Sequence, residues 1–327
     1  MLQTVEMPVW ALVLLVGFAA VTFASHFLFP SVRWFFRRRL ERAVAELNKR
    51  LERPIQPFKL ARRHDMIQRL IYDPEVNRAI VAHAREEGIP ENVAFETARR
   101  YAREIVPGFS ASLYFGVATR LARWLSNALY DVRLDHRDEG ALAGIDPQAT
   151  VVYVMNHRSN MDYVLVTYLA ANRSALAYAV GEWARIWPLS RLIRAMGAYF
   201  IRRKSRGELY RKVLARYVRL ATDGGVAQAV FPEGGLSLDG ALAAPRHGIL
   251  KYLAADRPTD ARDVVFVPVA LNYDRVLEDR VLIAAAKEGR RQFRARITVV
   301  IGFAMRMFWL RLRGRFRRFG QAGVRFG

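Results

Sequence analysis

The chain has 327 residues, of which 52% are hydrophobic and 25% charged, a balance that is typical of a folded protein and excludes a disordered one. It contains no cysteine, which excludes disulfides, thiolate metal sites and cysteine nucleophiles. Its 52 Lys and Arg residues against 30 Asp and Glu give a net charge of +22, which favours anionic partners such as nucleic acid, anionic lipid head groups or phosphorylated substrates.

The segment from Pro8 to Pro30 is apolar and contains no Asp, Glu, Lys or Arg. At about 1.5 Å per residue, a helix of this length just crosses the ~30 Å hydrocarbon layer of a bilayer. Basic residues follow the segment but do not precede it, so the positive-inside rule places the rest of the chain in the cytoplasm and a cleaved signal peptide is disfavoured. We therefore expect residues 1–31 to be a membrane anchor that spans or dips into the bilayer, with a buried core helix as the alternative.

Residues 32–145 are predicted to be almost wholly helical. Apolar side chains recur every three or four residues from Phe36 to Leu51, which predicts a helix that packs in a helical domain or lies on a membrane. Asp73 followed by Pro74 is typical of an N-cap and first turn. Helices are predicted to end near residues 88, 106 and 130.

From about residue 146, short apolar runs alternate with helical stretches. This alternation predicts an α/β fold, a largely parallel sheet covered by helices, over residues 146–305. The predicted strands are 151–155, 175–180, 198–201, 228–231, 264–271 and 297–301. Residues 306–327 are basic and aromatic without a clear period, so we expect a surface or membrane-apposed tail.

His157 stands at the end of a predicted buried strand and just before a helix, where open α/β sheets place their active residues. Asp162 follows five positions later, and residues five apart on one helix point about 140° away from each other. The two side chains meet only if His157 lies in the turn before the helix, with Ser159 as the N-cap. The carboxylate would then fix the imidazole tautomer and leave the other nitrogen as a general base. Alternatively, Asp162 only caps its helix and His157 fills a polar turn.

Arg202 and Arg203 end the predicted strand 198–201. A guanidinium has a planar fork that suits phosphate oxygens, so the two are candidates for binding a phosphoryl group. A solvated basic turn is the alternative.

Glu233, Gly234 and Gly235 form a predicted tight loop after the strand 228–231. The glycines allow the backbone to approach a ligand closely. Glu233 is a candidate for accepting a hydroxyl hydrogen bond or for holding Arg202, and an ordinary turn with a solvent-facing acid is the alternative. Pro268, inside the strand 264–271, predicts a bulge or an edge position.

Four segments occur in the order and spacing of a known enzyme family. They are Asn156-His157-Arg158-Ser159-x-x-Asp162-Tyr163, Gly197-Ala198-x-Phe200-Ile201-Arg202-Arg203, Phe231-x-Glu233-Gly234-Gly235 and Val267-Pro268-x-x-x-x-Tyr273-Asp274-Arg275. Over about residues 110–285 they resemble the four blocks of the glycerolipid acyltransferases with a His-x4-Asp motif. Most features are similar to the glycerol-3-phosphate and dihydroxyacetone-phosphate acyltransferases, whereas Asn156 and Phe-Pro-Glu-Gly are similar to the 1-acylglycerol-3-phosphate acyltransferases. Leu236 stands where the family commonly has Arg, which removes one expected phosphate contact.

The resemblance implies direct acyl transfer without a metal or a resident cofactor. His157, oriented by Asp162, would deprotonate the acceptor hydroxyl as it attacks the acyl carbonyl, and Ser159 would serve only as a cap. The arginines would hold the acceptor's phosphate, the glutamate would position its hydroxyls, and backbone amides at the glycines would steady developing charge. The implied substrate-binding residues are Arg158, Arg202, Arg203, Glu233, Gly234 and Gly235.

The resemblance also implies the substrates. An acyl group would pass from acyl-CoA or an acyl-acyl carrier protein to glycerol-3-phosphate, giving lysophosphatidic acid. The alternative acceptor is 1-acylglycerol-3-phosphate, which gives phosphatidic acid. Anionic membrane lipids are further expected partners, and we expect the catalytic domain at the cytoplasmic side of a bacterial inner membrane. An alternative of another class is a membrane-tethered nucleic-acid-binding protein, but no RNA-binding or helix-turn-helix signature is present, so nucleic acid is not an expected partner.

Overall fold

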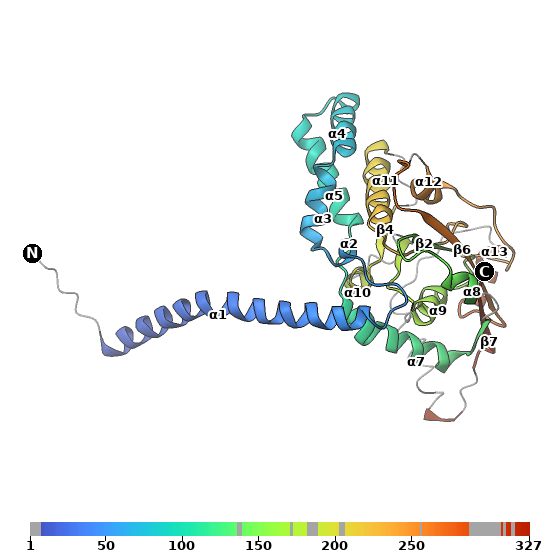
Figure 1. Cartoon of the computed structure of the whole chain (residues 1–327), viewed down its shortest axis with the longest axis horizontal. Helices are drawn as coiled ribbons and strands as arrows, with labels where there is room; N and C mark the ends of the chain where they lie inside the picture. Colours follow the sequence, from blue (N-terminus) through green and yellow to red (C-terminus); the bar gives the residue numbers. More distant parts are fainter. Residues whose placement is uncertain are drawn as a thin grey trace, which may run out of the picture. The chain divides into compact units, whose positions relative to one another are not determined.

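The computed structural model describes residues 8–135, 139–170, 173–181, 189–202, 207–255, 257–287, 309, 312–314 and 318–327. The chain divides into two compact units, Met1–Leu51 and Glu52–Gly327. The described part of the first unit is mainly one helix, α1 (Val9–Asn48), and the second unit is a layered α/β structure (Figure 1).

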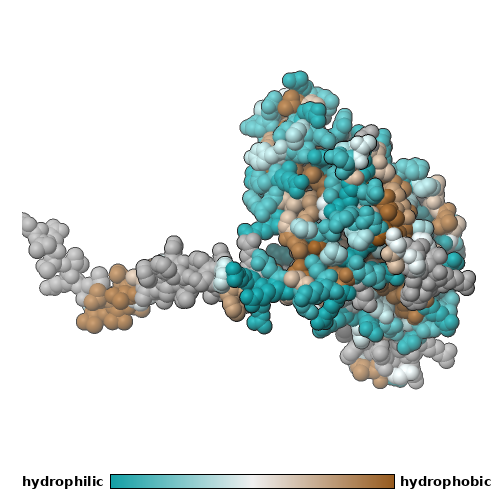
Figure 2. All heavy atoms as spheres, viewed as in Figure 1, coloured by the Kyte–Doolittle hydropathy of each residue, from teal (hydrophilic) through white to brown (hydrophobic). Residues whose placement is uncertain are grey.

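The helix α1 runs without a break through the apolar run and the basic stripe that the sequence suggests as separate segments. Its first turns expose large apolar side chains, among them Val9, Trp10 and Phe18, which form a hydrophobic cluster in Figure 2. The sequence predicts a membrane anchor at residues 1–31. Among the described residues, no helix combines the length and the apolar run that crossing a bilayer requires.

Most of the chain between residues 52 and 130 is helical, as predicted. Asp73 caps its helix, since its carboxylate accepts the Glu75 backbone N–H at 3.0 Å, and Gly88 ends the same helix with a φ of 62°. The prediction for residues 32–145 was wrong at its end, where a strand, β1, precedes a short helix, α8. The elements are α2 (Pro57–Leu60), α3 (Arg63–Ile71), α4 (Pro74–Glu87), α5 (Glu91–Ile105), α6 (Ala111–Leu113), the π-helical η1 (Tyr114–Ala118), α7 (Thr119–Leu129), β1 (Asp131–Asp135) and α8 (Glu139–Ala143).

The rest of the chain builds the predicted α/β sheet. Seven strands lie in the order β1-β7-β6-β2-β5-β3-β4, and each neighbouring pair is parallel except β6 and β7. The remaining strands are β2 (Thr150–Met155), β3 (Ala177–Gly181), β4 (Tyr199–Ile201), β5 (Gln228–Val230), β6 (Val264–Tyr273) and β7 (Gln321–Phe326). The remaining helices are α9 (Met161–Leu169), α10 (Leu189–Ala195), α11 (Glu208–Asp223), α12 (Gly248–Ala254) and α13 (Asp279–Lys287).

The strand β2 shows how side-chain alternation builds the layers. Val152 and Val154 pack with residues of α3, α4, α5 and α11. Val151, Tyr153 and Met155 face the other way and pack with residues of α7, α9 and β7. Successive side chains of a strand point to opposite faces, so the apolar residues of β2 pack into the hydrophobic clusters on both faces of the sheet. Figure 1 shows α4 and α11 on one side of the strands and α7 and α9 on the other.

The C-terminal residues correct the expectation of a surface tail over 306–327. Ala322, Val324 and Phe326 alternate along β7 and are buried against the sheet, which gives this strand the two-residue period of a core element. β7 pairs in parallel with β1 and antiparallel with β6. The predicted strand 297–301 lies outside the described residues.

Pro268 stays in register with Val154 of β2, so the predicted bulge is not found. Its carbonyl accepts the backbone N–H of Gly327 at 2.9 Å, just beyond the first β6–β7 pair, Val269 and Phe326. The N and the C=O of one strand residue face the same neighbour, so the proline nitrogen also faces the end of β7. The proline therefore costs the sheet no bond to β2.

Candidate active site

The parallel strands bring the predicted site residues to one edge of the sheet. Residues that follow β2, β4 and β5 all leave at the carboxyl ends of these strands. The loop after β5 adjoins the loop after β2, because the two strands pair directly. β4 is three strand spacings from β2, or about 14 Å. The sheet order therefore groups His157 with Glu233 and sets Arg202 further along the edge.

His157 and Asp162 meet as the sequence predicts. Nδ1 of His157 lies 2.8 Å from Oδ2 of Asp162, and only 4% and 0% of the two side chains are exposed. α9 begins at Met161, which places His157 in the turn before the helix and Asp162 in its first turn. The N-cap of α9 is Asn160 and not Ser159 as predicted, but Ser159 Oγ accepts the Met161 backbone N–H at 3.0 Å from one residue earlier and so still stabilises the start of the helix.

The Asp162 carboxylate receives three further hydrogen bonds. Oδ2 also accepts the backbone N–H groups of Arg158 at 2.7 Å and Ser159 at 3.1 Å, and Oδ1 accepts the Tyr273 hydroxyl at 2.7 Å. Hydrogen bonds of this kind stabilise the ionised form of a buried acid. An ionised carboxylate can only accept, so Nδ1 of His157 carries the hydrogen and Nε2 is left as the base.

The sequence offered Tyr273 only as part of a motif and gave it no role. It is the last residue of β6, which pairs with β2, and this pairing brings its hydroxyl to Asp162. Burial, followed by the charge of Asp162, raises the pKa of Tyr273 well above its ordinary value, so the phenol stays protonated and donates. A tyrosine at the end of the neighbouring strand was the signal that could have identified it.

Aromatic side chains fix the plane of the imidazole. The His157 ring stacks on Phe231 with centroids 4.2 Å apart, and the edge of the Tyr163 ring meets it at 5.4 Å. Phe231 and Tyr163 also contact each other at 5.0 Å. The ring is therefore held on its face and at its edge, as well as through Nδ1.

Glu233 holds backbone groups of two loops. Its Oε1 accepts the His157 backbone N–H at 3.0 Å and its Oε2 accepts the Ala243 backbone N–H at 3.1 Å. The buried carboxylate thus ties the catalytic turn to the loop after β5, while Arg202 pairs with Glu104 and not with Glu233. A hydrogen bond from an acceptor hydroxyl to Glu233 stays a prediction. The Ser237 N–H adds a bond to the His157 carbonyl at 2.9 Å.

The first glycine of the Gly-Gly pair serves the turn itself. Gly234 has a φ of 68°, which favours glycine, and its N–H donates to the Phe231 carbonyl at 3.0 Å. The Gly234 amide is therefore engaged in the turn, and a role for the Gly235 amide in steadying developing charge stays a prediction. A Cβ on Gly234 would lie 3.0 Å from Cδ of Arg246, so the turn also makes room for that side chain.

Arg202 is already paired. Its Nε and Nη2 donate to the two carboxylate oxygens of the buried Glu104 at 2.8 Å and 2.6 Å, and its guanidinium lies over the rings of Tyr101 and Tyr210. The hydrogen bond to Glu104 raises the pKa of Arg202 further above its ordinary value. The Arg202 guanidinium, which was predicted to bind phosphate, is thus paired with Glu104 of α5. Arg203 lies outside the described residues.

Arg158, by contrast, has guanidinium nitrogens without a hydrogen-bond partner. Its Nε and Nη1 are buried and find no hydrogen-bond acceptor. Nη1 lies against the turn at Gly240, and the charge of Arg158 is one of the smaller causes that lower the pKa of Asp239, after its backbone hydrogen bonds. Burying these two nitrogens without acceptors is costly, so an anion that reached them would be favoured.

Glu278 is a second residue that the sequence did not identify. Its Oε2 accepts the Ser159 hydroxyl at 2.7 Å, and its Oε1 accepts the backbone N–H and the side-chain amide of Asn160 at 3.2 Å and 3.0 Å. It directly precedes α13 and fixes the turn between His157 and α9. Nothing in the local sequence separates this acid from other surface acids.

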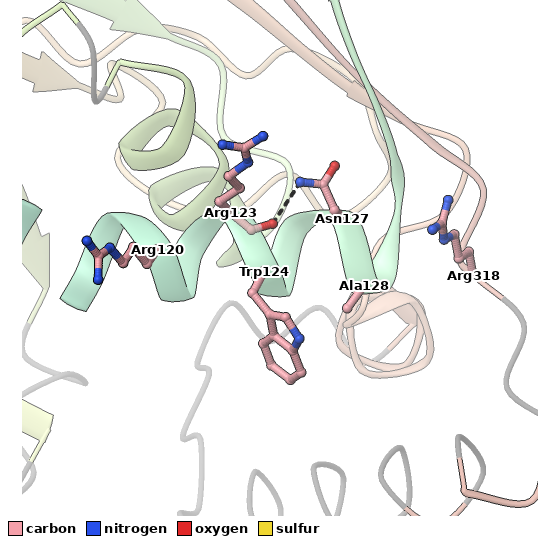
Figure 3. Close-up of a pocket in the computed structure, with 6 residues that line it drawn as sticks. All are labelled: Arg120, Arg123, Trp124, Asn127, Ala128 and Arg318. Carbon is pink, nitrogen blue, oxygen red and sulfur yellow. Dashed lines mark hydrogen bonds between the residues drawn. The ribbon is translucent and has the colours of Figure 1, made fainter. Parts of the chain in front are cut away.

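A cavity lies apart from these residues. It has a volume of about 450 Å³ and is lined by Arg120, Arg123, Trp124, Asn127, Ala128 and Arg318 (Figure 3). None of the predicted site residues lines it. Among the described residues, no group of three or more His, Asp or Glu side chains is arranged to hold a metal ion.

Comparison with known proteins gives a family for the region that holds the site. Residues 138–272 match the sequence model of the family described as Acyltransferase. Glycerol-3-phosphate acyltransferases of Pseudomonas entomophila (strain L48) and Shewanella loihica (strain ATCC BAA-1088 / PV-4) are 31% and 34% identical over 275 and 232 residues. These matches cover 82% and 67% of this chain but 32% and 28% of the relatives. The chain thus spans about a third of the length of the curated relatives it matches.

A solved structure is more distantly similar. The 1-acyl-sn-glycerophosphate acyltransferase from Thermotoga maritima is 18% identical, with a TM-score of 0.39 over 71% of this chain and 70% of its own. A likeness of that size carries no weight for fold or reaction. The family match, in contrast, contains His157, Asp162 and Glu233 with the geometry described above. Residues 138–272, which hold the site, are therefore similar to the Acyltransferase family.

Proposed function

We propose that this protein transfers a fatty acyl group from an acyl thioester to the hydroxyl of glycerol-3-phosphate, giving lysophosphatidic acid. The observation that carries the proposal is the buried His157–Asp162 pair, whose geometry leaves Nε2 as a base. The names of the similar curated proteins support glycerol-3-phosphate as the acceptor.

In the proposed reaction, Nε2 of His157 takes the proton of the acceptor hydroxyl as the oxygen attacks the thioester carbonyl. The C–S bond of the tetrahedral intermediate then breaks, and the imidazolium returns the proton to the leaving thiolate. Asp162 stabilises the imidazolium through Nδ1 at 2.8 Å. The steps balance without a covalent enzyme intermediate.

We assign the acceptor's phosphate first to Arg158. Its Nε and Nη1 are buried without acceptors and it directly follows His157 in the chain, whereas Arg202 is held by Glu104. Arg203 is proposed as a second ligand from its place in the second block. A phosphate dianion would supply the acceptors that Arg158 lacks.

The donor and the location follow from charge and apolar surface. Acyl-CoA and acyl-acyl carrier protein are both anionic and suit a chain of charge +22. Contact with anionic membrane lipids is supported by the exposed apolar side chains of α1. We place the reaction at the cytoplasmic face of a bacterial inner membrane, where the lipid product is needed.

The second candidate acceptor is 1-acylglycerol-3-phosphate. Leu236 in place of the common Arg favours it, because an apolar side chain after Gly235 suits an acceptor that already carries an acyl chain. Asn156, the other feature shared with that group, has a structural task, since its side chain bonds to both backbone groups of Leu271.

The test is acyl transfer by the purified full chain, with labelled acyl-CoA or acyl-acyl carrier protein and each acceptor in turn. We expect labelled lysophosphatidic acid from glycerol-3-phosphate, and a loss of at least about 100-fold in His157→Ala. His64→Ala, which changes an exposed histidine of α3, is the matched control and stays active. If product formed only from 1-acylglycerol-3-phosphate, glycerol-3-phosphate would be wrong as the acceptor and the second candidate would take its place.

A further inference from the structure

The helix α7 and the turn before it leave a line of apolar side chains in solvent. Val117, Leu121 and Trp124 are 54%, 51% and 59% exposed and follow one another at four and three residues, so they lie on one stripe. The face that α7 turns to the core is separate and includes Ala122 and Leu129. The exposed stripe therefore has no part in the described core.

Three arginines lie around the cavity that Trp124 lines. Arg120 and Arg123 of α7 line the 450 Å³ cavity together with Trp124, and Arg318, from the segment before β7, lines its other end. Figure 3 shows Arg123 on one side of the helix and Trp124 on the other. No acid lines the cavity, and none of the ion pairs found among the described residues uses these three arginines. We call Val117, Leu121, Trp124 and the three arginines the α7 surface.

We propose that the α7 surface binds the surface of an anionic phospholipid bilayer. A bilayer matches both halves of this surface, because its phosphates take the arginines and its acyl region takes the apolar stripe. Tryptophan at the boundary between the two is typical of the lipid interface. An acidic carrier protein would satisfy the arginines but leaves three apolar side chains along one stripe less well matched.

This inference rests on the proposed contact with anionic lipid and adds to α1 a second lipid-binding surface, on the α/β unit. α7 leads into β1, and its inner face packs with α9, the helix that carries Asp162. A bilayer bound at α7 would therefore lie against the layer that supports the catalytic acid. The lipid product would then form close to the membrane that receives it.

The test is flotation of the full chain with vesicles of phosphatidylcholine, with and without phosphatidylglycerol. We expect Arg120→Glu/Arg123→Glu to lower the bound-to-free ratio on anionic vesicles at least about 10-fold. The matched control, Arg78→Glu/Arg85→Glu, makes the same charge change at exposed positions of α4 and retains binding. Leu121→Ala/Trp124→Ala lowers binding to both kinds of vesicle, because it removes apolar contact.

A second readout places Trp124 itself in the lipid. Brominated lipids quench tryptophan within the bilayer, so the wild-type chain should lose fluorescence that Trp124→Phe lacks. Wild-type binding by the α7 variants, with no quenching assigned to Trp124, would overturn the inference. Loss of acyl carrier protein binding, with vesicle binding intact, would assign the surface to the carrier instead.

Two controls separate this inference from the proposed function. Circular dichroism and thermal unfolding must show that the variants remain folded. With a short-chain acyl-CoA and glycerol-3-phosphate in solution, the α7 variants should transfer acyl groups at the wild-type rate. A wild-type chain that binds vesicles through α7 but transfers no acyl group would overturn the proposed function and leave this inference standing.

Discussion

Tyr273 donates its hydroxyl hydrogen to Oδ1 of Asp162 at 2.7 Å, from a strand 111 residues further along the chain. The same carboxylate holds Nδ1 of the catalytic imidazole through its other oxygen. The phenol thus acts on the base through the acid: it draws negative charge from the carboxylate and limits how strongly that carboxylate favours the imidazolium. Tyr273 is a positioning residue, two hydrogen bonds from the reacting atoms.

Tyr273→Phe should lower kcat and leave the KM for glycerol-3-phosphate nearly unchanged. Without the phenol, Asp162 loses the hydrogen bond at Oδ1 that fixes the carboxylate against the imidazole. We expect a fall in kcat of about 3- to 10-fold, measured by steady-state kinetics. Tyr130→Phe removes a neighbouring buried hydroxyl that donates to the Arg275 carbonyl, and should keep the wild-type kcat. A wild-type kcat in Tyr273→Phe would assign the tyrosine to packing alone.

Glu233→Gln should lower kcat and leave the KM for glycerol-3-phosphate nearly unchanged. The carboxylate accepts two backbone N–H groups, and an amide NH₂ would oppose one of these donors. We expect a fall in kcat of about 10-fold or more and a loss of about 1 to 2 kcal/mol in the free energy of unfolding. A raised KM with an unchanged kcat would show instead that Glu233 touches the acceptor.

Arg158→Gln and Arg202→Gln should differ in kind. The first removes guanidinium nitrogens that are buried without acceptors, so the KM for glycerol-3-phosphate should rise about 10-fold or more while stability changes little. The second removes the two-bond ion pair between Arg202 and the buried Glu104, so the free energy of unfolding should fall by about 1 to 3 kcal/mol. Steady-state kinetics and denaturant unfolding of both variants measure these effects. A raised KM in Arg202→Gln, with an unchanged KM in Arg158→Gln, would show instead that Arg202 binds the phosphate.

The local part of the site could be predicted from the sequence. A buried strand followed by a short turn and a helix fixes the backbone path between His157 and Asp162, so five residues suffice to bring the two together. The parallel strands were predictable for the same reason, because each is a short apolar run that alternates with helices.

The long-range part could not be predicted. Glu278 is 119 residues from Ser159, and Glu104 is 98 residues from Arg202. Such partners depend on strand order, and the order here is not that of the chain. The strand β7 was missed because six residues with three inward side chains give little signal, and the sheet supplies the rest of its stability. An arginine paired with an acid cannot be told from an unpaired one in the sequence. The sequence therefore favoured Arg202 as the phosphate ligand, whereas the structure pairs Arg202 with Glu104 and favours Arg158.

The buried tyrosines should make the fold sensitive to alkali. Burial raises the pKa of Tyr114 from 10.0 to about 12, and burial also raises the pKa of Tyr178, Tyr199 and Tyr217. Below pH 10 the folded and unfolded chains keep the Tyr114 proton alike. Between pH 10 and 12 only the unfolded chain loses it, so the free energy of unfolding falls as the pH rises, by about 3 kcal/mol for this residue.

Tyr114→Phe should therefore make the decline above pH 10 shallower, although it also removes the acceptor for the Leu176 N–H and lowers stability at neutral pH. Denaturant unfolding at a series of pH values measures the slope, and tyrosinate absorbance should rise together with the loss of helical circular dichroism. Tyr72→Phe, which changes an exposed tyrosine, is the matched control and should keep the wild-type slope. A wild-type slope in Tyr114→Phe would mean that this phenol ionises within the folded chain, which its complete burial opposes.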